Sequence, residues 1–229
     1  MISSGTIKSF VRRARTKKKY QQAIADYWPE MGITYKNQLL VAKNFFLNEQ
    51  QLLLDIGFGM GTGLVTQALT NPKTNFLGIE VYLPGIGSCL KLAHKSRVMN
   101  LRIICSDVVD VLERMIPDNS LFKVQLFFPD PWKKKRHYKR RLLQKDFAEL
   151  VLRKLIPQGI FHIATDFESY AEQIITIMNN ISGYNNLSVN QDYVSRPFTR
   201  PFTKFEIRAQ RLGYIIRDIM YEKLSSFIS

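Results

Sequence analysis

Acidic residues stand near the ends of all five central strands expected in this chain, a pattern suited to binding a nucleotide-like ligand. In open α/β sheets, ligands bind beyond the carboxyl ends of the strands. Carboxylates at that edge accept hydrogen bonds from ribose hydroxyls, amines and base amino groups. A fold has no structural need for so many acids at equivalent positions, so we expect one cleft to contain Asp55, Glu80, Asp107, Asp130 and Asp166.

A glycine-rich turn follows the first expected strand. Residues 52–56 are apolar except for Asp55, and glycines occupy positions 57, 59, 61 and 63. Such glycines either let a ligand approach the backbone or supply turns that need positive φ. The spacing differs from the dinucleotide fingerprint G-x-G-x-x-G, because Thr62 occupies the position of its third glycine. The turn therefore argues against a nicotinamide-dependent oxidoreductase.

Three of the acids suit particular groups of a nucleotide-like cofactor. Glu80 lies 23 residues after Gly57, near the spacing of the ribose-binding acid in nucleotide-binding units. Asp107 suits an adenine amino group, and Asp55 lies where an amine of the cofactor could meet it. For Asp107 and Asp166 the alternative is a carboxylate that caps the N-terminus of a helix.

Asp130 lies between two prolines, just ahead of a basic segment. Pro131 restricts the backbone of Asp130, and each proline ring fixes its own φ, so the carboxylate is presented rigidly. Residues 133–141 contain seven Lys and Arg residues and no acid. We therefore expect a polyanion to be held beside Asp130. Trp132 and Tyr138 could stack on bases, although Trp132 could equally pack against the scaffold.

The positive charge of the chain is concentrated in two places. The net charge is +14, and 13 of the 33 basic residues lie within residues 12–19 and 133–141. The other 20 basic residues nearly balance the 19 acidic ones. Two basic patches on a nearly neutral body indicate a nucleic-acid ligand. The alternative is a pair of solvated loops that aid solubility.

Alternating strands and helices are expected to position these residues. We predict strands at 51–56, 75–80, 101–105, 122–128 and 159–165. We predict helices at 36–47, 61–70, 84–97, 108–115, 144–155 and 168–181. This alternation is typical of an α/β fold with a parallel, doubly wound sheet.

The two ends of the chain have a different pattern. Residues 187–194 and 212–222 are predicted to be antiparallel strands joined by an Arg/Pro-rich loop. Residues 1–35 are expected to form a basic N-terminal arm, which precedes a domain at 36–229.

Seven motifs that occur in order resemble the bacterial tRNA (guanine-N7-)-methyltransferase family. The resemblance begins near residue 8, where Phe10-Val11-Arg12-Arg13 is similar to the family's N-terminal arm, and continues to the C-terminus. The most specific motif is Phe-Phe-Pro-Asp-Pro-Trp followed by basic residues. The motifs are Asp55-Ile-Gly-Phe-Gly-Met-Gly, Gly78-Ile-Glu-Val81, Pro84-Gly-Ile-Gly87, Phe127-Phe-Pro-Asp-Pro-Trp132, Lys139-Arg-Arg141, His162-Ile-Ala-Thr-Asp166 and Thr203-Lys-Phe-Glu206.

The resemblance implies a Rossmann-like S-adenosylmethionine-dependent methyltransferase fold, with a mostly parallel seven-stranded sheet and an antiparallel C-terminal hairpin. It implies methyl transfer from S-adenosylmethionine to N7 of a guanosine in the variable loop of tRNA, position 46 in tRNA numbering. It implies that Asp130 is catalytic and that the cofactor is bound by Asp55, Gly57, Gly59, Glu80, Asp107 and Asp130. The implied substrate contacts are Lys134, Asp166, Thr203, Lys204, Phe205 and Glu206, and the implied RNA contacts are Arg136, His137, Tyr138, Lys139, Arg140 and Arg141.

Composition argues against several other classes of protein. Cys89 and Cys105 lack C-x-x-C spacing and the three histidines lack ligand spacing, so we expect neither disulfides nor a metal. We find no signal peptide and no uncharged apolar run of about 18 residues, so we expect a cytoplasmic protein without a membrane span.

Two other functions and two oligomeric states stay open. One alternative is a methyltransferase that acts on another RNA or on a protein. The other is a non-catalytic RNA-binding protein on the same fold, which should have lost its strand-end acids, whereas here they are present. The sequence is compatible with a monomer and with a homodimer.

Overall fold

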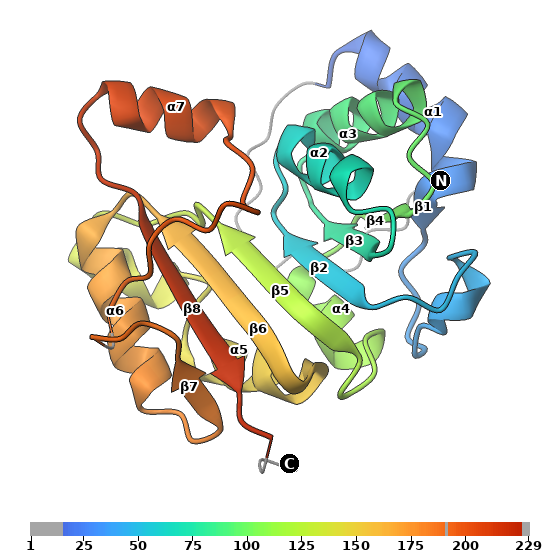
Figure 1. Ribbon diagram of the computed structural model, residues 1–229. Coiled ribbons are helices and arrows are strands. Elements are labelled where there is room, and N and C mark those ends of the chain that lie inside the picture. The colour runs from blue at the N-terminus through green and yellow to red at the C-terminus, as the bar shows by residue number, and fades with distance from the viewer. Residues whose placement is uncertain (1–15, 191, 226–229) are drawn as a thin grey trace. The chain divides into compact units, whose positions relative to one another are not determined.

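The computed structural model describes residues 16–190 and 192–225, and the chain divides into two compact units (Figure 1). Unit 1 ends at Pro117, and unit 2 begins at Asp118. The expected arm motif Phe10-Val11-Arg12-Arg13 lies outside the described residues.

The described part of unit 1 contains four parallel strands in the order β1-β4-β3-β2. Strands β2 and β3 are buried along their whole length, and their apolar sequences are typical of parallel strands covered on both faces. The elements are α1 (Lys18–Met31), β1 (Gly32–Ile33), the 3-10 helix η1 (Ala42–Asn44), β2 (Leu52–Ile56), α2 (Thr62–Thr70), β3 (Asn75–Ile79), α3 (Leu83–Lys95), β4 (Leu101–Ile104) and α4 (Val108–Arg114).

Helix α1 and strand β1 pack within unit 1. Strand β1 pairs with β4 (Figure 1). Tyr27 of α1 stacks on His94 of α3, with ring centroids 4.1 Å apart. A Cβ added to Gly87 of α3 would lie 2.5 Å from the carbonyl oxygen of Tyr20, so this glycine lets the two helices pack closely. The predicted arm of residues 1–35 therefore includes a helix and a strand of unit 1.

The predicted helix at residues 36–47 is wrong, because only the short η1 forms there. Leu40 and Phe46 are buried, and the Leu40 amide donates a hydrogen bond of 2.7 Å to the carbonyl oxygen of Met115, at the end of α4. Burial of these separated side chains and pairing with a distant carbonyl hold the segment in an irregular conformation.

Unit 2 contains four strands in the order β5-β6-β8-β7 over its described residues. Strand β5 is parallel to β6, whereas β8 is antiparallel to both β6 and β7. Helix α7 lies beyond the carboxyl ends of β5 and β6 (Figure 1). The elements are β5 (Leu121–Phe127), the 3-10 helix η2 (Lys135–Arg140), α5 (Lys145–Lys154), β6 (Leu155–Thr165), α6 (Glu168–Asn179), β7 (Tyr184–Asn186), α7 (Lys204–Arg211) and β8 (Arg217–Lys223).

The C-terminal region differs from the prediction in two respects. The strand expected at 187–194 is wrong for its described residues, where only an isolated bridge from Val194 to Asp218 forms. Local hydrogen bonds compete with strand pairing here: the Ser188 hydroxyl donates to Asp192 at 2.7 Å. Helix α7 forms where a loop was expected. The Thr203 hydroxyl caps this helix by accepting a 3.0 Å hydrogen bond from the amide of Glu206, the third residue of the helix.

The central elements agree with the predicted α/β alternation. The five predicted central strands all form, and each observed bound lies within four residues of the predicted one. Antiparallel pairing at the C-terminus is also confirmed. The described residues contain eight strands rather than seven, because the two-residue β1 was not expected.

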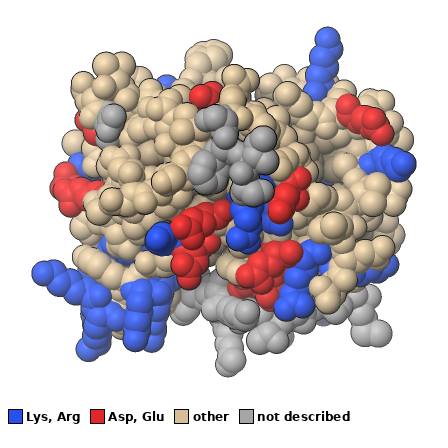
Figure 2. Space-filling model, turned by 90° about the horizontal axis from the view of Figure 1, so that it is seen from below, with Lys and Arg blue, Asp and Glu red and all other residues tan. Residues whose placement is uncertain are grey.

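Basic and acidic side chains both occur on the face shown in Figure 2. A search of the described ranges finds no helix long and apolar enough to cross a membrane.

Candidate functional site

The carboxyl ends of the strands in unit 1 lie in register. Ile56 of β2 is aligned with Ile79 of β3, which is aligned with Ile104 of β4. Two backbone hydrogen bonds continue this alignment past the strand ends, from the Gly57 amide to the Ile79 carbonyl (2.8 Å) and from the Glu80 amide to the Ile104 carbonyl (3.1 Å). The glycine turn and Glu80 are therefore neighbours at one edge of the sheet.

The turn after β2, residues 57–61, is called the glycine loop below. Gly57, Gly59 and Gly61 all have positive φ, at 71°, 58° and 78°. A Cβ added at Gly57 or Gly59 would have no neighbouring atom within 4 Å. These two glycines are thus needed for backbone conformation, and open space lies beside them where a ligand can approach.

Glu80 ties the glycine loop to the start of α3. One carboxylate oxygen, Oε2, accepts a 2.9 Å hydrogen bond from the Gly59 amide. The other, Oε1, accepts from the amides of Val81 (2.7 Å) and Tyr82 (2.9 Å). The acid at the end of the second predicted strand therefore also shapes the loop that precedes it.

The other two strand-end acids expected in the site of unit 1, Asp55 and Asp107, are buried. Asp55 is 5% exposed, and burial, followed by the charge of Glu80, raises its pKa to about 7. Asp107 is the N-cap of α4, since its Oδ1 accepts a 2.9 Å hydrogen bond from the Val109 amide. The N-cap alternative is confirmed for Asp107, although a carboxylate has about four acceptor positions and is not exhausted by one cap bond.

These residues fit S-adenosylmethionine. Asp55 is a buried carboxyl whose pKa is raised to about 7. A cation beside such a carboxyl favours its ionised form, and the amino group of S-adenosylmethionine is a cation that could pair with it. The open space beside Gly57 and Gly59 leaves the backbone accessible to the ligand. Asp55, Gly57, Gly59, Glu80 and Asp107 are the residues of unit 1 that would hold it.

In unit 2, Asp130 lies in a strained loop, residues 128–132, called the proline loop below. Phe128 and Trp132 both have positive φ, at 53° and 43°. Positive φ is uncommon for residues other than glycine, and such strain gathers at functional sites. The Phe128 amide donates a 2.7 Å hydrogen bond to the Ala164 carbonyl of β6, and the Asp130 side chain is exposed.

Asp166 follows the parallel neighbour of β5, at the same edge of the sheet as the proline loop. It is half-buried and follows the end of β6 directly. The N-cap of α6 is Phe167, and no side chain caps that helix. Asp166 is therefore not the cap considered from sequence.

Most of the basic segment, residues 133–141, is at the surface. Lys134, Arg136, Lys139 and Arg140 are exposed and His137 is half-buried. Trp132 packs edge-on against His137, with centroids 5.6 Å apart, and the Arg140 guanidinium lies 5.2 Å from the Trp132 ring centroid. These contacts match the packing alternative for Trp132.

The last residue of the segment, Arg141, is placed differently from its neighbours. It is only 1% exposed, so it does not lie at the surface with the other residues expected to contact RNA. The half-buried Tyr138 ring stacks on it, with the guanidinium carbon 3.5 Å from the ring centroid. The structure thus uses Tyr138 to cover Arg141.

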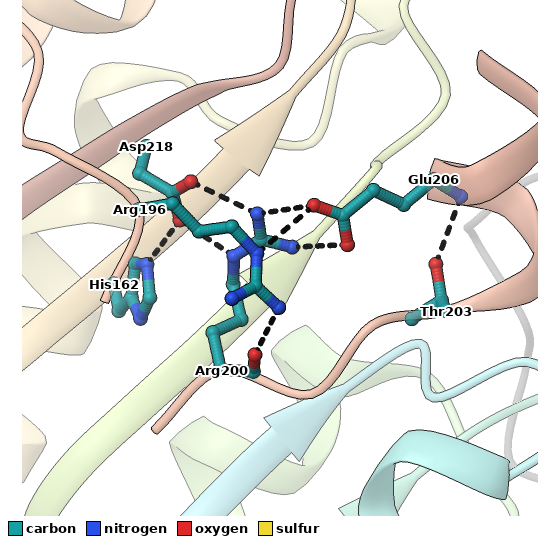
Figure 3. Close-up of polar contacts among 6 residues, drawn as sticks. All are labelled: His162, Arg196, Arg200, Thr203, Glu206 and Asp218. Atoms are coloured by element: carbon teal, nitrogen blue, oxygen red, sulfur yellow. Dashed lines mark hydrogen bonds and ion pairs between the residues drawn. The ribbon is translucent and has the colours of Figure 1, made fainter. Parts of the chain in front are cut away.

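Glu206, expected to contact the substrate, is fully buried in an ion-pair network (Figure 3). Its two carboxylate oxygens accept hydrogen bonds of 2.8 and 2.7 Å from Arg200, and Oε1 also accepts from Arg196 at 3.2 Å. Arg200 in turn donates to Asp218 at 3.0 Å, and Asp218 pairs with His162 at 2.7 Å. Both carboxylate oxygens of Glu206 therefore accept hydrogen bonds from arginine side chains of the protein itself.

The sequence did not predict this buried ion-pair network. Arg200 is 1% exposed and Asp218 is 2% exposed, although charged residues are seldom buried. His162 is fully buried, and burial lowers its pKa. Within the described part of the chain, no three His, Cys, Asp or Glu side chains are grouped so that they could hold a metal ion. Thr203 acts as the α7 cap, and the side chains of Lys204 and Phe205 lie outside the described part of the structure.

Comparison with known proteins places this geometry in a family. A family profile described as "Putative methyltransferase" matches residues 49–219. The tRNA (guanine-N(7)-)-methyltransferase of Cronobacter sakazakii is 55% identical over 219 residues, which cover 95% of this chain and 92% of that protein.

Solved structures at low sequence identity confirm the methyltransferase fold. An rRNA methylase from Streptococcus thermophilus has a TM-score of 0.53 at 11% identity, over 77% of this chain and 89% of that one. A 16S rRNA (adenine(1408)-N(1))-methyltransferase from Catenulisporales acidiphilia, solved with S-adenosylmethionine, has a TM-score of 0.50 at 15% identity, over 78% of this chain and 88% of that one. The profile match and the 55% identical relative show that the chain belongs to the tRNA (guanine-N7-)-methyltransferase family.

Proposed function

We propose that this chain acts in the cytoplasm and methylates the variable-loop guanosine of tRNA, position 46 in tRNA numbering. Its family gives the broader activity, which is S-adenosylmethionine-dependent methylation of guanine N7 in tRNA. One observation supports most strongly the placement of the active site at Asp130. This residue is exposed in a strained loop that leads directly into an exposed basic segment.

The reaction needs alignment more than proton transfer. S-adenosylmethionine, when bound, supplies a sulfonium methyl group that guanine N7 can accept through its lone pair, and N7 carries no proton to remove. The protein therefore has to align two reactants and shape the electric field around them. Alignment of bound reactants lowers a barrier by about 7–11 kcal/mol.

In this proposal Asp130 provides electrostatic stabilisation. Methylation leaves positive charge on the imidazole ring of guanine, and a fixed carboxylate nearby stabilises that charge as it develops. The rigid proline loop suits this role, because a preorganised charge needs no reorganisation during the reaction. No proton transfer is assigned to Asp130.

The acids of unit 1 hold the methyl donor in this proposal. Asp55 pairs with its amino group, which favours the ionised carboxylate and lowers the raised pKa of Asp55. Glu80 accepts from the ribose hydroxyls, Asp107 accepts from the adenine amino group, and Gly57 and Gly59 allow close approach of the backbone.

The tRNA is bound by residues of unit 2 in this proposal. Asp166 accepts from guanine N1–H and its amino group, a donor pair that adenine lacks. Lys134 and the exposed members of the basic segment, Arg136, Lys139 and Arg140, bind phosphates. Glu206 has a different part, because its buried pairing with Arg200 makes it a support for the start of α7, where Thr203 to Phe205 were expected to meet the substrate.

Methyl transfer from labelled S-adenosylmethionine to unmodified tRNA, with nucleoside mass spectrometry of the product, tests the proposal. We expect 7-methylguanosine, which disappears when the variable-loop guanosine is replaced by adenosine and persists when a guanosine in another loop is replaced. Label in another RNA or at another tRNA position would overturn the site assignment. Bound tRNA without label would favour a non-catalytic RNA-binding protein.

A further inference from the structure

We propose that Arg141 is a positioning residue for Asp130 and does not contact RNA. The inference rests on the proposed role of Asp130, and it separates Arg141 from the other basic residues of its segment. Its basis is what the buried guanidinium touches.

The Arg141 guanidinium joins the proline loop to helix α6. Its Nε donates a 2.7 Å hydrogen bond to the carbonyl oxygen of Pro131, the residue after Asp130. Its Nη1 donates to the Gln173 side chain and to the Ser169 carbonyl oxygen (3.4 Å), and its Nη2 donates to the Ser169 hydroxyl (3.4 Å). The bond to Pro131 holds the peptide that links Pro131 to the left-handed Trp132.

Aromatic rings enclose the same guanidinium. Its carbon lies 3.5 Å from the Tyr138 ring centroid and 4.6 Å from that of Tyr170. Tyr138 is itself held by a 3.3 Å hydrogen bond between its hydroxyl and that of Ser169. Only the planar, five-donor fork of arginine can stack on rings and bond in three directions at once.

The charge of Arg141 is buried against neutral groups. Its hydrogen-bond partners are two carbonyl oxygens, a hydroxyl and an amide, and no carboxylate pairs with it among the described residues. Burying a charge without a carboxylate is costly. A neutral side chain would fill the space at lower cost, so the arrangement is explained better by the geometry that it imposes on the proline loop.

Arg141 and Asp130 both act on the Tyr170 hydroxyl. Burial raises the pKa of Tyr170 to about 12, and among the smaller influences Arg141 lowers that pKa whereas Asp130 raises it. Both charges therefore lie near one hydroxyl. The contact through which Arg141 acts on Asp130 is the hydrogen bond to the Pro131 carbonyl oxygen.

The decisive variant is Arg141→Lys, which keeps the charge but loses the fork. Steady-state kinetics with tRNA and S-adenosylmethionine should show kcat reduced roughly 10–100-fold, as small misplacements of a catalytic group do, with KM for tRNA within about twofold of wild type. Arg153→Lys, an exposed arginine on α5, is the matched control and should leave both constants unchanged. Lys139→Ala should show the reverse pattern, with KM raised and a shallower dependence on salt.

Folding and the proposed function are monitored separately. Tm and the Kd for S-adenosylhomocysteine should be preserved in Arg141→Lys; if they are not, Gln173→Leu, which removes one Arg141 partner from α6, should still lower kcat at unchanged KM. An Arg141→Lys enzyme with wild-type kcat, or a lowered affinity for tRNA with a shallower salt dependence, would overturn the inference. Absence of 7-methylguanosine with wild-type enzyme would instead show that the proposed function fails.

Discussion

The glycine loop of unit 1 and the proline loop of unit 2 both place residues at positive φ, but they do so by different means. In the glycine loop the residues themselves permit the conformation, and Glu80 fixes it with hydrogen bonds to Gly59 and to the start of α3. In the proline loop the strained residues are Phe128 and Trp132, which resist such φ values. Contacts from elsewhere in unit 2 must therefore impose them.

Two buried arginines supply those contacts. Arg141 holds the Pro131 carbonyl oxygen at 2.7 Å. Arg200 lies with its guanidinium carbon 5.9 Å from the Phe128 ring centroid, and it is held there by Glu206 and Asp218. The comparison teaches that a binding loop can be encoded locally, whereas a rigidly presented charged group depends on distant residues of the same unit.

Glu206→Gln tests that dependence with the largest expected effect. The change leaves Arg200 buried without its closest anion, and breaking a buried pair in this way costs about 3–5 kcal/mol. Urea unfolding should report the loss. Glu149→Gln is the control, because Glu149 pairs with Lys145 at the surface of α5, where such pairs contribute only about 0.3–0.5 kcal/mol. A loss below about 1 kcal/mol for Glu206→Gln would show that the network does not support this region.

Gly59→Ala tests the local encoding of the glycine loop. A side chain at φ 58° costs about 1–2 kcal/mol of stability, and it would also occupy the open space proposed for the cofactor. Gly213→Ala is a matched control, since Gly213 has φ 78° and equally open surroundings at the end of α7. Both variants should lose similar stability, but only Gly59→Ala should weaken binding of S-adenosylhomocysteine in calorimetry. Equal affinity in the two variants would contradict a cofactor role for the loop.

Asp55 should make cofactor binding depend on pH. Its pKa of about 7 in the free protein means that the carboxylate takes up a proton as pH falls below 7. If the cofactor amine pairs with the ionised form, Kd for S-adenosylhomocysteine should rise by about tenfold per pH unit below 7. Asp55→Asn should flatten this profile, whereas Glu113→Gln, at an exposed site on α4, should keep it.

The raised pKa of Asp55 also makes the stability of the folded protein depend on pH. The direction is opposite to that of a carboxylate in an ordinary ion pair. The folded pKa is raised above the usual value near 3.9, so the folded protein binds more protons than the unfolded chain between about pH 4 and 7. The contribution of Asp55 to stability therefore falls as pH rises through this window. Thermal unfolding of wild type against Asp55→Asn measures the difference, and parallel pH profiles would refute the raised pKa.

The predictable parts of the molecule are those encoded by neighbouring residues. The apolar runs of β2 and β3 and the alternate glycines after Asp55 identify the parallel strands and the glycine loop, because periodicity and φ preference are local properties. The prolines around Asp130 likewise mark a rigid presentation. The strand-end positions of the acids follow from the same strand boundaries.

The parts missed from sequence depend on tertiary contacts. Nothing in the run of basic residues 133–141 distinguishes the buried Arg141 from the exposed Arg140 beside it. Helix α7 was not predicted, because its cap, Thr203, follows an Arg/Pro-rich stretch that is typical of a loop. From sequence alone, Arg200 in this stretch would be expected at the surface. Residues 36–47 have helical spacing, yet pairing of Leu40 with Met115 decides their conformation.

The central claim is that Asp130 acts on the chemical step while unit 1 binds the donor. Asp130→Asn tests it most directly, because the amide keeps the shape of the side chain and removes its charge. Single-turnover methyl transfer at saturating tRNA should slow by about 10²–10³-fold, while Kd for S-adenosylhomocysteine stays within about threefold of wild type. An unchanged rate, or a loss of cofactor affinity equal to the loss of rate, would contradict the account.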